Sequence, residues 1–503
     1  MIRLKLVLVI FSLFSSVAYG FGDYPYYDVH ETAVDGKKND LRMLHNGLAS
    51  LALRIDMIRR AEKEIVMEYF IWERDLTGKI LLLELMRKSR QMQKANKPFK
   101  VKIIVDKSIT IFEVNEYYAE VLNKYGIEIA YHNRALDPLT AQFRDHRKLI
   151  AMDGVEAITG GRNIGDDYFD MDKEYNFLDR DVWVKGPMAR TMRDSFMGYW
   201  NHKRMVKEAT PFIVEEFSPL VRSQRRRNTL KLEIHERKRK EAREFFKVTE
   251  EVKLASPKIM KVGMEILKKF PVYNCPKMTF ASDLPGSRGA SLLFEDYDKY
   301  RLLRKVIFNK MYAVKKSLFI ESPYWILNKP YGQTIKDLLA NGKEVTALTN
   351  SLNSTDAYYV SALFYDQVFN YEKLGLRPFI YNADFLDNNP VAEKKVKDVR
   401  WGLHAKTQIY DDDSIMIGTY NIDNRSDHFN NEMAIFCDGS KEIVQDLRNN
   451  IKERMTQAYE ITDDMQATDG KGNSVDVFGG APKEAIKSMR NWKIPARLFE
   501  PLM

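Results

Sequence analysis

Short apolar runs that end in a polar residue recur along the chain, and longer stretches with leucines at helical spacing follow them. Residues 65–72 and 318–325 both carry a glutamate that is followed four residues later by a tryptophan. Residues 101–106 and 345–350 form a second pair of such runs, and each ends in Asp or Asn. Strand-like runs that alternate with helical stretches predict an α/β fold with substantial parallel pairing.

The matching order of these runs indicates that the chain contains two divergent copies of one unit. We place the first copy at residues 40–215 and the second at residues 270–503. Between them, residues 216–269 include a strongly basic run, with ten Lys or Arg against four Glu over residues 222–244. This run supplies +6 of the net charge of +9. It predicts a charged linker helix, with docking to a membrane surface or a partner as the alternative.

The first twenty residues have the organisation of a secretory signal peptide. Arg3 and Lys5 precede an apolar run at residues 6–17, and small residues follow at positions 18 and 20. The run is shorter than the roughly 20 residues that a membrane span needs. We therefore predict a signal peptide over residues 1–20, with an uncleaved anchor as the alternative.

The chain has two cysteines, Cys275 and Cys437. Residues so far apart make neither a zinc-binding pattern nor a CxxC motif. They can form a disulfide in an oxidising compartment or remain two buried thiols, and both interpretations stay open at this point.

The same polar motif, His-x-Lys-x4-Asp-x6-Gly-x-x-Asn, occurs once in each copy. A single His-x-Lys-x4-Asp arises readily by chance. Two occurrences at identical spacing and in corresponding places are a strong signal of a shared site. The members are His146, Lys148, Asp153, Gly160 and Asn163 in the first copy, and His404, Lys406, Asp411, Gly418 and Asn421 in the second.

The spacing of the motif indicates acid–base chemistry on a phosphate. A histidine and a lysine two residues apart on a strand point to the same face. A pseudo-twofold relation between the copies would bring His146 and His404 into one pocket, where the lysines bind phosphate oxygens and the asparagines donate neutral hydrogen bonds. Asp153 and Asp411 complete the candidate catalytic set, although both begin turns and a structural role is the more direct interpretation.

One acidic residue in each copy is placed to orient a histidine. Asp179 lies seven residues before Gly186, and Glu432 lies seven residues before Gly439, with an apolar strand between them in both cases. A buried carboxylate that accepts a hydrogen bond from one imidazole nitrogen fixes the tautomer and supports the imidazolium. We predict this role for Asp179 and Glu432, and a surface acid in a hairpin is the alternative.

The duplicated motif resembles that of the phospholipase D superfamily, and its flanking residues are similar to those of bacterial cardiolipin synthases, most of all the C type. The resemblance implies a pair of pseudo-symmetric α/β/α half-domains that share one active site. Thr419 departs from the family pattern, in which a serine is common at this position. The similar segments are residues 69–78, 160–169, 321–324, 349–356 and 421–432.

The resemblance also implies a reaction. One histidine attacks phosphorus to form a phosphatidyl-histidine, the other protonates the leaving alcohol, and a second alcohol or water then takes the lipid phosphate. Family habit assigns the attack to His146 and the proton transfer to His404. No metal ion or other cofactor is implied. The groups expected to bind or orient the phosphate and the histidines are Asn163, Asn421, Thr419, Glu432 and Asp179.

We expect a phosphatidyltransferase of the cardiolipin synthase type that acts on phospholipid headgroups at a membrane surface. A secreted hydrolytic phospholipase D differs from it only in using water as the acceptor. A nuclease of the same superfamily would hold nucleic acid through the basic run, but nucleic acid is not the expected partner because both motifs lie in one long chain. The intact His, Lys and Asn residues disfavour a non-catalytic membrane-binding protein. The signal peptide and the resemblance together predict export across a bacterial inner membrane, to the periplasm, the exterior or a membrane surface.

Overall fold

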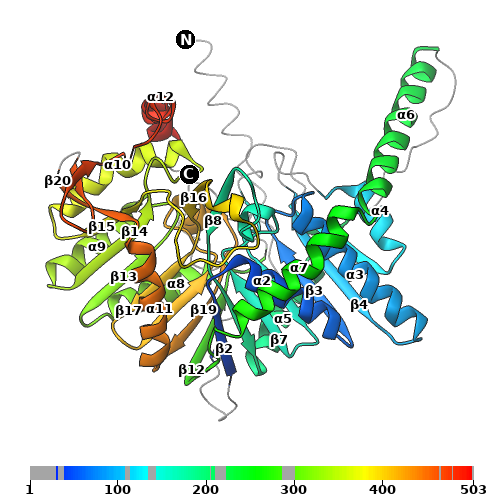
Figure 1. Cartoon of the computed structure of the whole chain (residues 1–503), viewed down its shortest axis with the longest axis horizontal. Helices are drawn as coiled ribbons and strands as arrows, with labels where there is room; N and C mark the ends of the chain where they lie inside the picture. The colour runs from blue at the N-terminus through cyan, green and yellow to red at the C-terminus, as the bar shows by residue number, and fades with distance from the viewer. Residues whose placement is uncertain are drawn as a thin grey trace, which may run out of the picture.

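The computed structural model of the chain describes residues 30–31, 39–107, 114–133, 143–203, 205–209, 222–285, 301–463, 466–478 and 480–500 (Figure 1). The predicted signal peptide at residues 1–20 lies outside these ranges. Among the helices within them, none combines the length and the apolar character that crossing a membrane requires.

The first half of the chain is built on a nine-stranded sheet with the order β10-β5-β4-β3-β6-β7-β9-β2-β11. β3, β4 and β5 pair in parallel because the helices α3 and α4 return the chain to the same edge of the sheet. The remaining neighbours pair antiparallel. The strands are β2 (Asn39–Leu44), β3 (Glu64–Tyr69), β4 (Lys100–Asp106), β5 (Ile127–His132), β6 (Leu149–Met152), β7 (Glu156–Gly160), β9 (Asp181–Lys185), β10 (Val206–Glu208) and β11 (Tyr273–Cys275).

The second half is built on an eleven-stranded sheet with the order β1-β12-β19-β18-β17-β13-β14-β15-β20-β21-β22. Here β13, β14 and β15 are the parallel strands, and α9 and α10 make the crossovers. The strands are β1 (His30–Glu31), β12 (Lys277–Ser282), β13 (Ser317–Glu321), β14 (Glu344–Asn350), β15 (Arg377–Tyr381), β17 (Thr407–Tyr410), β18 (Ser414–Gly418), β19 (Met433–Asp438), β20 (Ala458–Asp463), β21 (Gln466–Thr468) and β22 (Ser474–Asp476).

The two sheets repeat one topology. The order β5-β4-β3-β6-β7-β9-β2 in the first sheet corresponds strand for strand to β15-β14-β13-β17-β18-β19-β12 in the second. The α/β fold with two similar halves that the sequence predicts is therefore confirmed. The strand β11 falls within residues 270–503, the range expected for the second copy, yet it pairs with β2 of the first sheet.

Helices cover the outer faces of the sheets and also lie between them (Figure 1). One apolar cluster joins side chains from both sheets, such as Val182 and Ile435, with side chains of α5 and α11, such as Phe196 and Leu447. This shared core holds the halves together as one body. The helices are α2 (Gly47–Arg60), α3 (Leu76–Lys94), α4 (Glu116–Asn123), α5 (Pro187–Asn201), α8 (Leu302–Tyr312), α9 (Lys329–Ala340), α10 (Tyr358–Glu372), α11 (Lys441–Met455) and α12 (Lys483–Phe499).

Two helices occupy the charged range between the halves, α6 (Arg222–Phe245) and α7 (Glu250–Leu267). Figure 1 shows α6 projecting from the body, whereas α7 lies along α2. The contact between α7 and α2 is close at Gly263, where an added Cβ would come within 2.4 Å of the Leu48 carbonyl oxygen. The C-terminal part of α6 is nevertheless packed on the body, because Ala242 is buried and Arg239 pairs with Glu120 of α4 at 3.0 Å.

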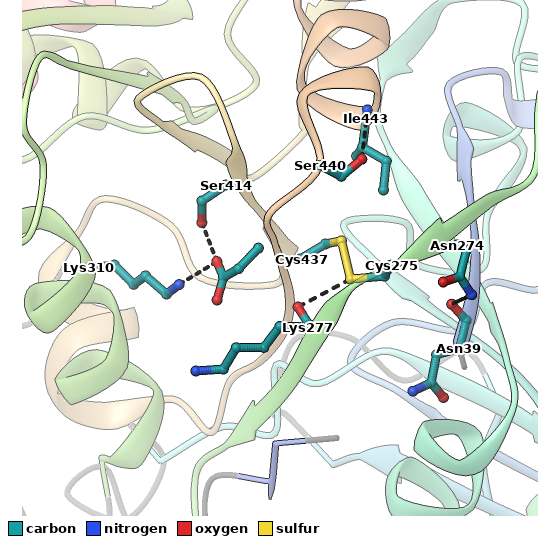
Figure 2. Close-up of a disulfide and its surroundings, with 10 residues drawn as sticks. Asn39, Asn274, Cys275, Lys277, Lys310, Ser414, Cys437, Ser440 and Ile443 are labelled. Carbon is teal, nitrogen blue, oxygen red and sulfur yellow. Dashed lines mark hydrogen bonds and ion pairs between the residues drawn. A yellow bond between two sulfur atoms is a disulfide. The ribbon is translucent and has the colours of Figure 1, made fainter. Parts of the chain in front are cut away.

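A disulfide between Cys275 and Cys437 joins the two sheets (Figure 2). Cys275 ends β11 of the first sheet, and Cys437 lies in β19 of the second. Their Cα atoms are 5.8 Å apart, within the usual range for a disulfide. Of the two interpretations that the sequence leaves open, the structure therefore has the disulfide.

Candidate active site

The backbone of each half reaches into the other half beside the motif histidines. β8 (Tyr175–Leu178) of the first half pairs in parallel with β16 (Arg400–Leu403) of the second. Immediately after β16, the amide N of His404 donates to the carbonyl of Leu178 at 2.9 Å. The symmetry-related contact runs from the amide N of His146 to the carbonyl of Asn431 at 3.0 Å. The backbone of each motif histidine is therefore hydrogen-bonded to the opposite half.

His146 is held by a carboxylate of the second half. Its Nδ1 lies 3.0 Å and 2.9 Å from the two carboxylate oxygens of Glu432, the residue after Asn431. The same carboxylate accepts hydrogen bonds from the hydroxyl groups of Thr419 at 2.5 Å and Ser426 at 2.7 Å. Thr419 thus retains the donor function of the more common serine, and its target is the carboxylate that orients His146.

His404 is held by a carboxylate of the first half. Its Nδ1 lies 2.6 Å from Oδ2 of Asp179, the residue after Leu178. The position that corresponds to Thr419 in the first motif is Gly161, and a Cβ there would lie 2.1 Å from Oδ1 of Asp179. The dyad of His404 therefore combines the shorter acid, Asp179, with a glycine at position 161. The dyad of His146 combines the longer acid, Glu432, with the hydroxyl of Thr419.

Both dyads use Nδ1 of the histidine, and this fixes which nitrogen carries the chemistry. A carboxylate that accepts from Nδ1–H selects the tautomer in which Nε2 has the lone pair. In each dyad Nε2 is then the ring nitrogen that faces away from the carboxylate, and at His404 it lies 3.0 Å from Nζ of Lys406. The roles that the sequence predicts for Asp179 and Glu432 correspond to these contacts, but each acid acts on the histidine of the opposite half.

The two acids differ in their electrostatic surroundings. Burial raises the pKa of Glu432 to about 7, although Lys148 and its hydroxyl donors act in the opposite direction. Burial would also raise the pKa of Asp179, but His404, Lys406 and Arg162 together hold it well below the usual value. Asp179 is therefore a full negative charge at neutral pH, while Glu432 is close to its midpoint.

The motif lysines line the same site. Nζ of Lys148 donates to the carbonyl of His146 at 2.8 Å, and Nζ of Lys406 donates to the carbonyl of His404 at 2.6 Å. Burial lowers the pKa of Lys148 to about 7 and that of Lys406 to about 8. Burial also lowers the pKa of both histidines, with Lys148 and Lys406 adding to the effect. This crowding of positive groups favours an anionic ligand at the site.

Both motif asparagines are buried. Oδ1 of Asn163 accepts from the backbone amide of Ile71 at 3.3 Å, and its side chain also hydrogen-bonds Tyr168. Oδ1 of Asn421 is buried and has no hydrogen-bond partner among the residues that the structure describes. A phosphate-binding role for the two asparagines stays a prediction from the motif.

The motif aspartates lie at turns and contact backbone instead. The carboxylate of Asp153 accepts from three consecutive amides, those of residues 62–64, at 2.8 Å. Asp411 does the same with the amides of residues 315–317 at 2.7–3.2 Å. Both residues have positive φ, 54° in each case. Within the part of the chain that the structure describes, neither carboxylate hydrogen-bonds a motif histidine, and the contacts support the turn-forming role instead of a catalytic one.

Several residues around the site were not predicted. The rings of Phe177 and Tyr168 pack on His404 at centroid distances of 4.8 Å and 5.1 Å, and Phe70 packs on His146 at 5.3 Å. Ser426 is a further donor to Glu432, as described above. Phe70, Tyr168 and Ser426 belong to segments that carry the family likeness, and this is the signal that marks them. Their local pattern does not indicate which way the side chains point.

A buried ionic network supports Asp179 from behind. Glu321 pairs with Arg180 and with Arg454 at 2.5 Å each. Arg454 also donates to the backbone carbonyl of Asp179 at 3.0 Å, and Arg162 donates to the same carbonyl at 2.9 Å. Glu321 occupies the position in the second half that Glu68 occupies in the first, and Glu68 pairs with Arg147 at 3.1 Å. The repeat marked these glutamates, but only the structure shows their arginine partners.

Comparisons with known proteins agree with this arrangement. The family model described as "Cardiolipin synthase, PLD-like domain" matches residues 55–200 and 307–455, one segment in each half. An uncharacterized protein of Helicobacter pylori (strain J99) is 27% identical over 443 residues, which cover 83% of this chain and 80% of that protein. A protein named cardiolipin synthase from Geobacillus sp. (strain WCH70) is 23% identical, over 84% of this chain and 68% of its own.

A solved structure shares the fold. The crystal structure of phosphatidylserine synthase from Haemophilus influenzae Rd KW20 aligns with a TM-score of 0.61 at 15% identity, covering 92% of this chain and 95% of that one. At this identity the likeness concerns the fold. The family match, in contrast, spans more than half of the chain and includes both motifs. The chain therefore belongs to the phospholipase D superfamily, in the family of cardiolipin synthase-like domains, and is an enzyme of that superfamily.

Proposed function

We propose that the protein is a phosphatidyltransferase of the cardiolipin synthase type, which moves a phosphatidyl group from one headgroup alcohol to another through a phosphohistidine intermediate. The observation that carries this proposal is the pair of buried imidazoles, each held through Nδ1 by a carboxylate of the opposite half. Two such dyads beside two buried ammonium groups supply a nucleophile, an acid–base group and a cationic phosphate site.

In the first half-reaction, Nε2 of His146 attacks the phosphorus of a phospholipid. A P–N bond forms and the bond between phosphorus and the headgroup oxygen breaks. The imidazolium of His404 gives its Nε2 proton to that oxygen, and the headgroup alcohol leaves. In the second half-reaction, His404 takes the proton of an incoming alcohol, whose oxygen attacks phosphorus and releases His146. Charge and protons balance over the cycle.

The unequal carboxylates support this division of roles. A general acid must be protonated at the moment of transfer. Burial and Lys406 lower the pKa of His404, and the ionised carboxylate of Asp179 acts against them in favour of the imidazolium. Glu432 shares its negative charge with two hydroxyl donors and has a pKa near 7, so it stabilises an imidazolium at His146 less strongly. His146 is thus the better candidate for the neutral nucleophile.

We also propose that the protein acts outside the cytoplasm. The support comes from the predicted signal peptide at residues 1–20 and from the disulfide of Cys275 with Cys437. Disulfides persist in exported proteins and are rare in reducing cytosol. Fractionation of cells that express the full chain tests this localisation, because a cytoplasmic protein with free thiols would contradict it.

Product analysis tests the proposed reaction. The purified protein is incubated with phosphatidylethanolamine and phosphatidylglycerol, with and without chelator, beside His146→Ala and His404→Ala. Cardiolipin that forms only with both histidines supports the transferase. Phosphatidic acid as the sole product would instead identify a hydrolytic phospholipase D, and no lipid turnover would direct the search to nucleic-acid phosphodiesters.

A further inference from the structure

The helix α12 exposes apolar side chains to water. Ile494 and Leu498 are 72% and 74% exposed, and Trp492 is 41% exposed. Ile494 and Leu498 are four residues apart, so they are neighbours on one face of the helix. The opposite face is packed, since Ala485, Met489 and Ala496 are buried. Single exposed apolar residues are ordinary, but an unpartnered apolar row on an otherwise packed helix calls for a partner.

Positive charge surrounds the apolar row. The segment Lys483–Phe499 contains five Lys or Arg and one Glu, a net charge of +4. Lys487 lies two turns before Ile494 on the same face, and Arg490 lies one turn before it; both are exposed. Apolar side chains flanked by bases along one helix face suit the boundary between acyl chains and anionic headgroups.

The helix is fastened to the body along its other side. Lys493 and Arg497 both pair with Asp366 of α10, at 2.9 Å and 2.7 Å. Those two cations are therefore engaged with the protein, and they orient α12 on α10 with Ile494 and Leu498 directed away. Figure 1 shows α12 next to α10, in the second half of the molecule.

Two contacts join α12 to the active-site rim. The ring of Trp492 lies 6.0 Å from that of Tyr359, which is 36% exposed. The residue after α12, Glu500, accepts a hydrogen bond through its carbonyl from Nδ2 of Asn424 at 2.6 Å. Asn424 lies three residues after the motif residue Asn421 and caps the short helical turn Arg425–Phe429, which precedes Glu432. The C-terminal end of α12 is thus hydrogen-bonded to the segment that lies between Asn421 and Glu432.

We propose that α12 docks the protein on the surface of an anionic phospholipid bilayer, with Ile494 and Leu498 inserted among the lipids and Lys487 and Arg490 at the phosphates. The contacts of Trp492 and Glu500 then set the catalytic site next to the membrane from which its lipids come. This inference rests on the proposed function in one respect, that the membrane supplies the lipid substrate. The docking itself is measurable in the absence of turnover.

Vesicle binding by the full-length protein tests the docking surface. The probes are vesicles of phosphatidylcholine with about one-third phosphatidylglycerol, and vesicles of phosphatidylcholine alone. We expect the double variant Ile494→Gln, Leu498→Gln to bind the anionic vesicles at least about tenfold more weakly than the parent protein. The matched control is Leu254→Gln, because Leu254 is 75% exposed on α7, outside the proposed docking face. This variant should bind the vesicles as the parent protein does.

Charge reversal gives a second variant that leaves the apolar row intact. Lys487→Glu with Arg490→Glu should abolish the preference for anionic vesicles while thermal unfolding stays at the parent temperature, since both side chains are exposed. Equal vesicle binding by the parent and both double variants would overturn the proposal. A drop in oligomer size by sedimentation, with vesicle binding unchanged, would also overturn it and assign the face to a second copy of the chain. Failure of lipid turnover in the parent contradicts the proposed function alone.

Discussion

Oδ2 of Asp179, in the first half of the chain, lies 2.6 Å from Nδ1 of His404, in the second half. Glu432 and His146 make the reciprocal contact. Neither half contains a histidine together with the carboxylate that orients it. The site therefore depends on how the two halves are held against each other.

Asp179→Asn should inactivate the protein with little change in its fold. The amide keeps the volume of the carboxylate but removes its charge and changes the hydrogen bond to Nδ1, so His404 loses its preferred tautomer and its imidazolium support. We expect a fall in kcat of about 10²- to 10⁴-fold, measured as release of the headgroup alcohol. Asp387→Asn, at an exposed aspartate, is the matched control. Activity within a few-fold of the parent would show that Asp179 does not position His404.

Gly161→Ala should disturb the same dyad from the other side. The added methyl would lie 2.1 Å from Oδ1 of Asp179, so the carboxylate must move away from His404. We expect a fall in kcat of about 100-fold or more, because misplacement of a catalytic group by an ångström has this effect. Gly470→Ala is the control, since nothing lies within 4 Å of the Cβ position there. A fully active Gly161→Ala protein would mean that the dyad tolerates this displacement.

The pH dependence of kcat/KM should report the buried lysines. The pKa values of Lys148 and Lys406 are lowered to about 7 and about 8. Both lysines bind phosphate only as ammonium groups, so activity is present below these values and is lost as the pH rises through them. We therefore expect a steep basic limb above about pH 8 in the free enzyme.

Lys406→Arg should make that limb shallower, because the guanidinium stays charged and only Lys148 still loses its proton. The measurement is a profile of kcat/KM in buffers of constant ionic strength. A value that stays constant up to the ordinary range of lysine titration would contradict the lowered pKa values and the phosphate-binding role together.

Reduction of the disulfide should lower stability substantially. The cross-link between Cys275 and Cys437 closes a loop with a sequence separation of 162 residues and connects the two sheets. The chain-entropy relation gives a stabilisation of about 5 kcal/mol for a loop of this length, with about 2–5 kcal/mol usual for native disulfides. Dithiothreitol should therefore lower the melting temperature of the parent protein but not that of Cys437→Ser. A count of two free thiols in the denatured, unreduced protein would contradict the disulfide.

Much of the site was predictable because its signal is local. The motif around His146 and the motif around His404 have identical internal spacing, and spacing along a strand determines which side chains share a face. The repeat also marked Asp179 and Glu432, because each precedes a strand and a glycine at the same distance. The turn roles of Asp153 and Asp411 follow from similarly local patterns.

The exchange of partners between the halves was not predictable in this way. β8 pairs with β16, although more than two hundred residues separate them in the sequence. The residue pattern within either strand does not indicate which strand it pairs with. For the same reason the sequence left the pairing of Cys275 with Cys437 open, since their distance depends on how the sheets pack. The arginines behind Asp179, such as Arg454, likewise become partners only when the shared core has formed.

Trapping of the covalent intermediate tests the central claim most directly. The donor is a phosphatidyl ester of p-nitrophenol labelled in its phosphate, because this leaving group departs without a proton from His404. We predict that His404→Ala releases one equivalent of nitrophenol and retains an acid-labile label on the peptide that contains His146, while His146→Ala retains none. A label that persists in His146→Ala, or lipid products formed with no labelled protein in any variant, would contradict the phosphohistidine mechanism.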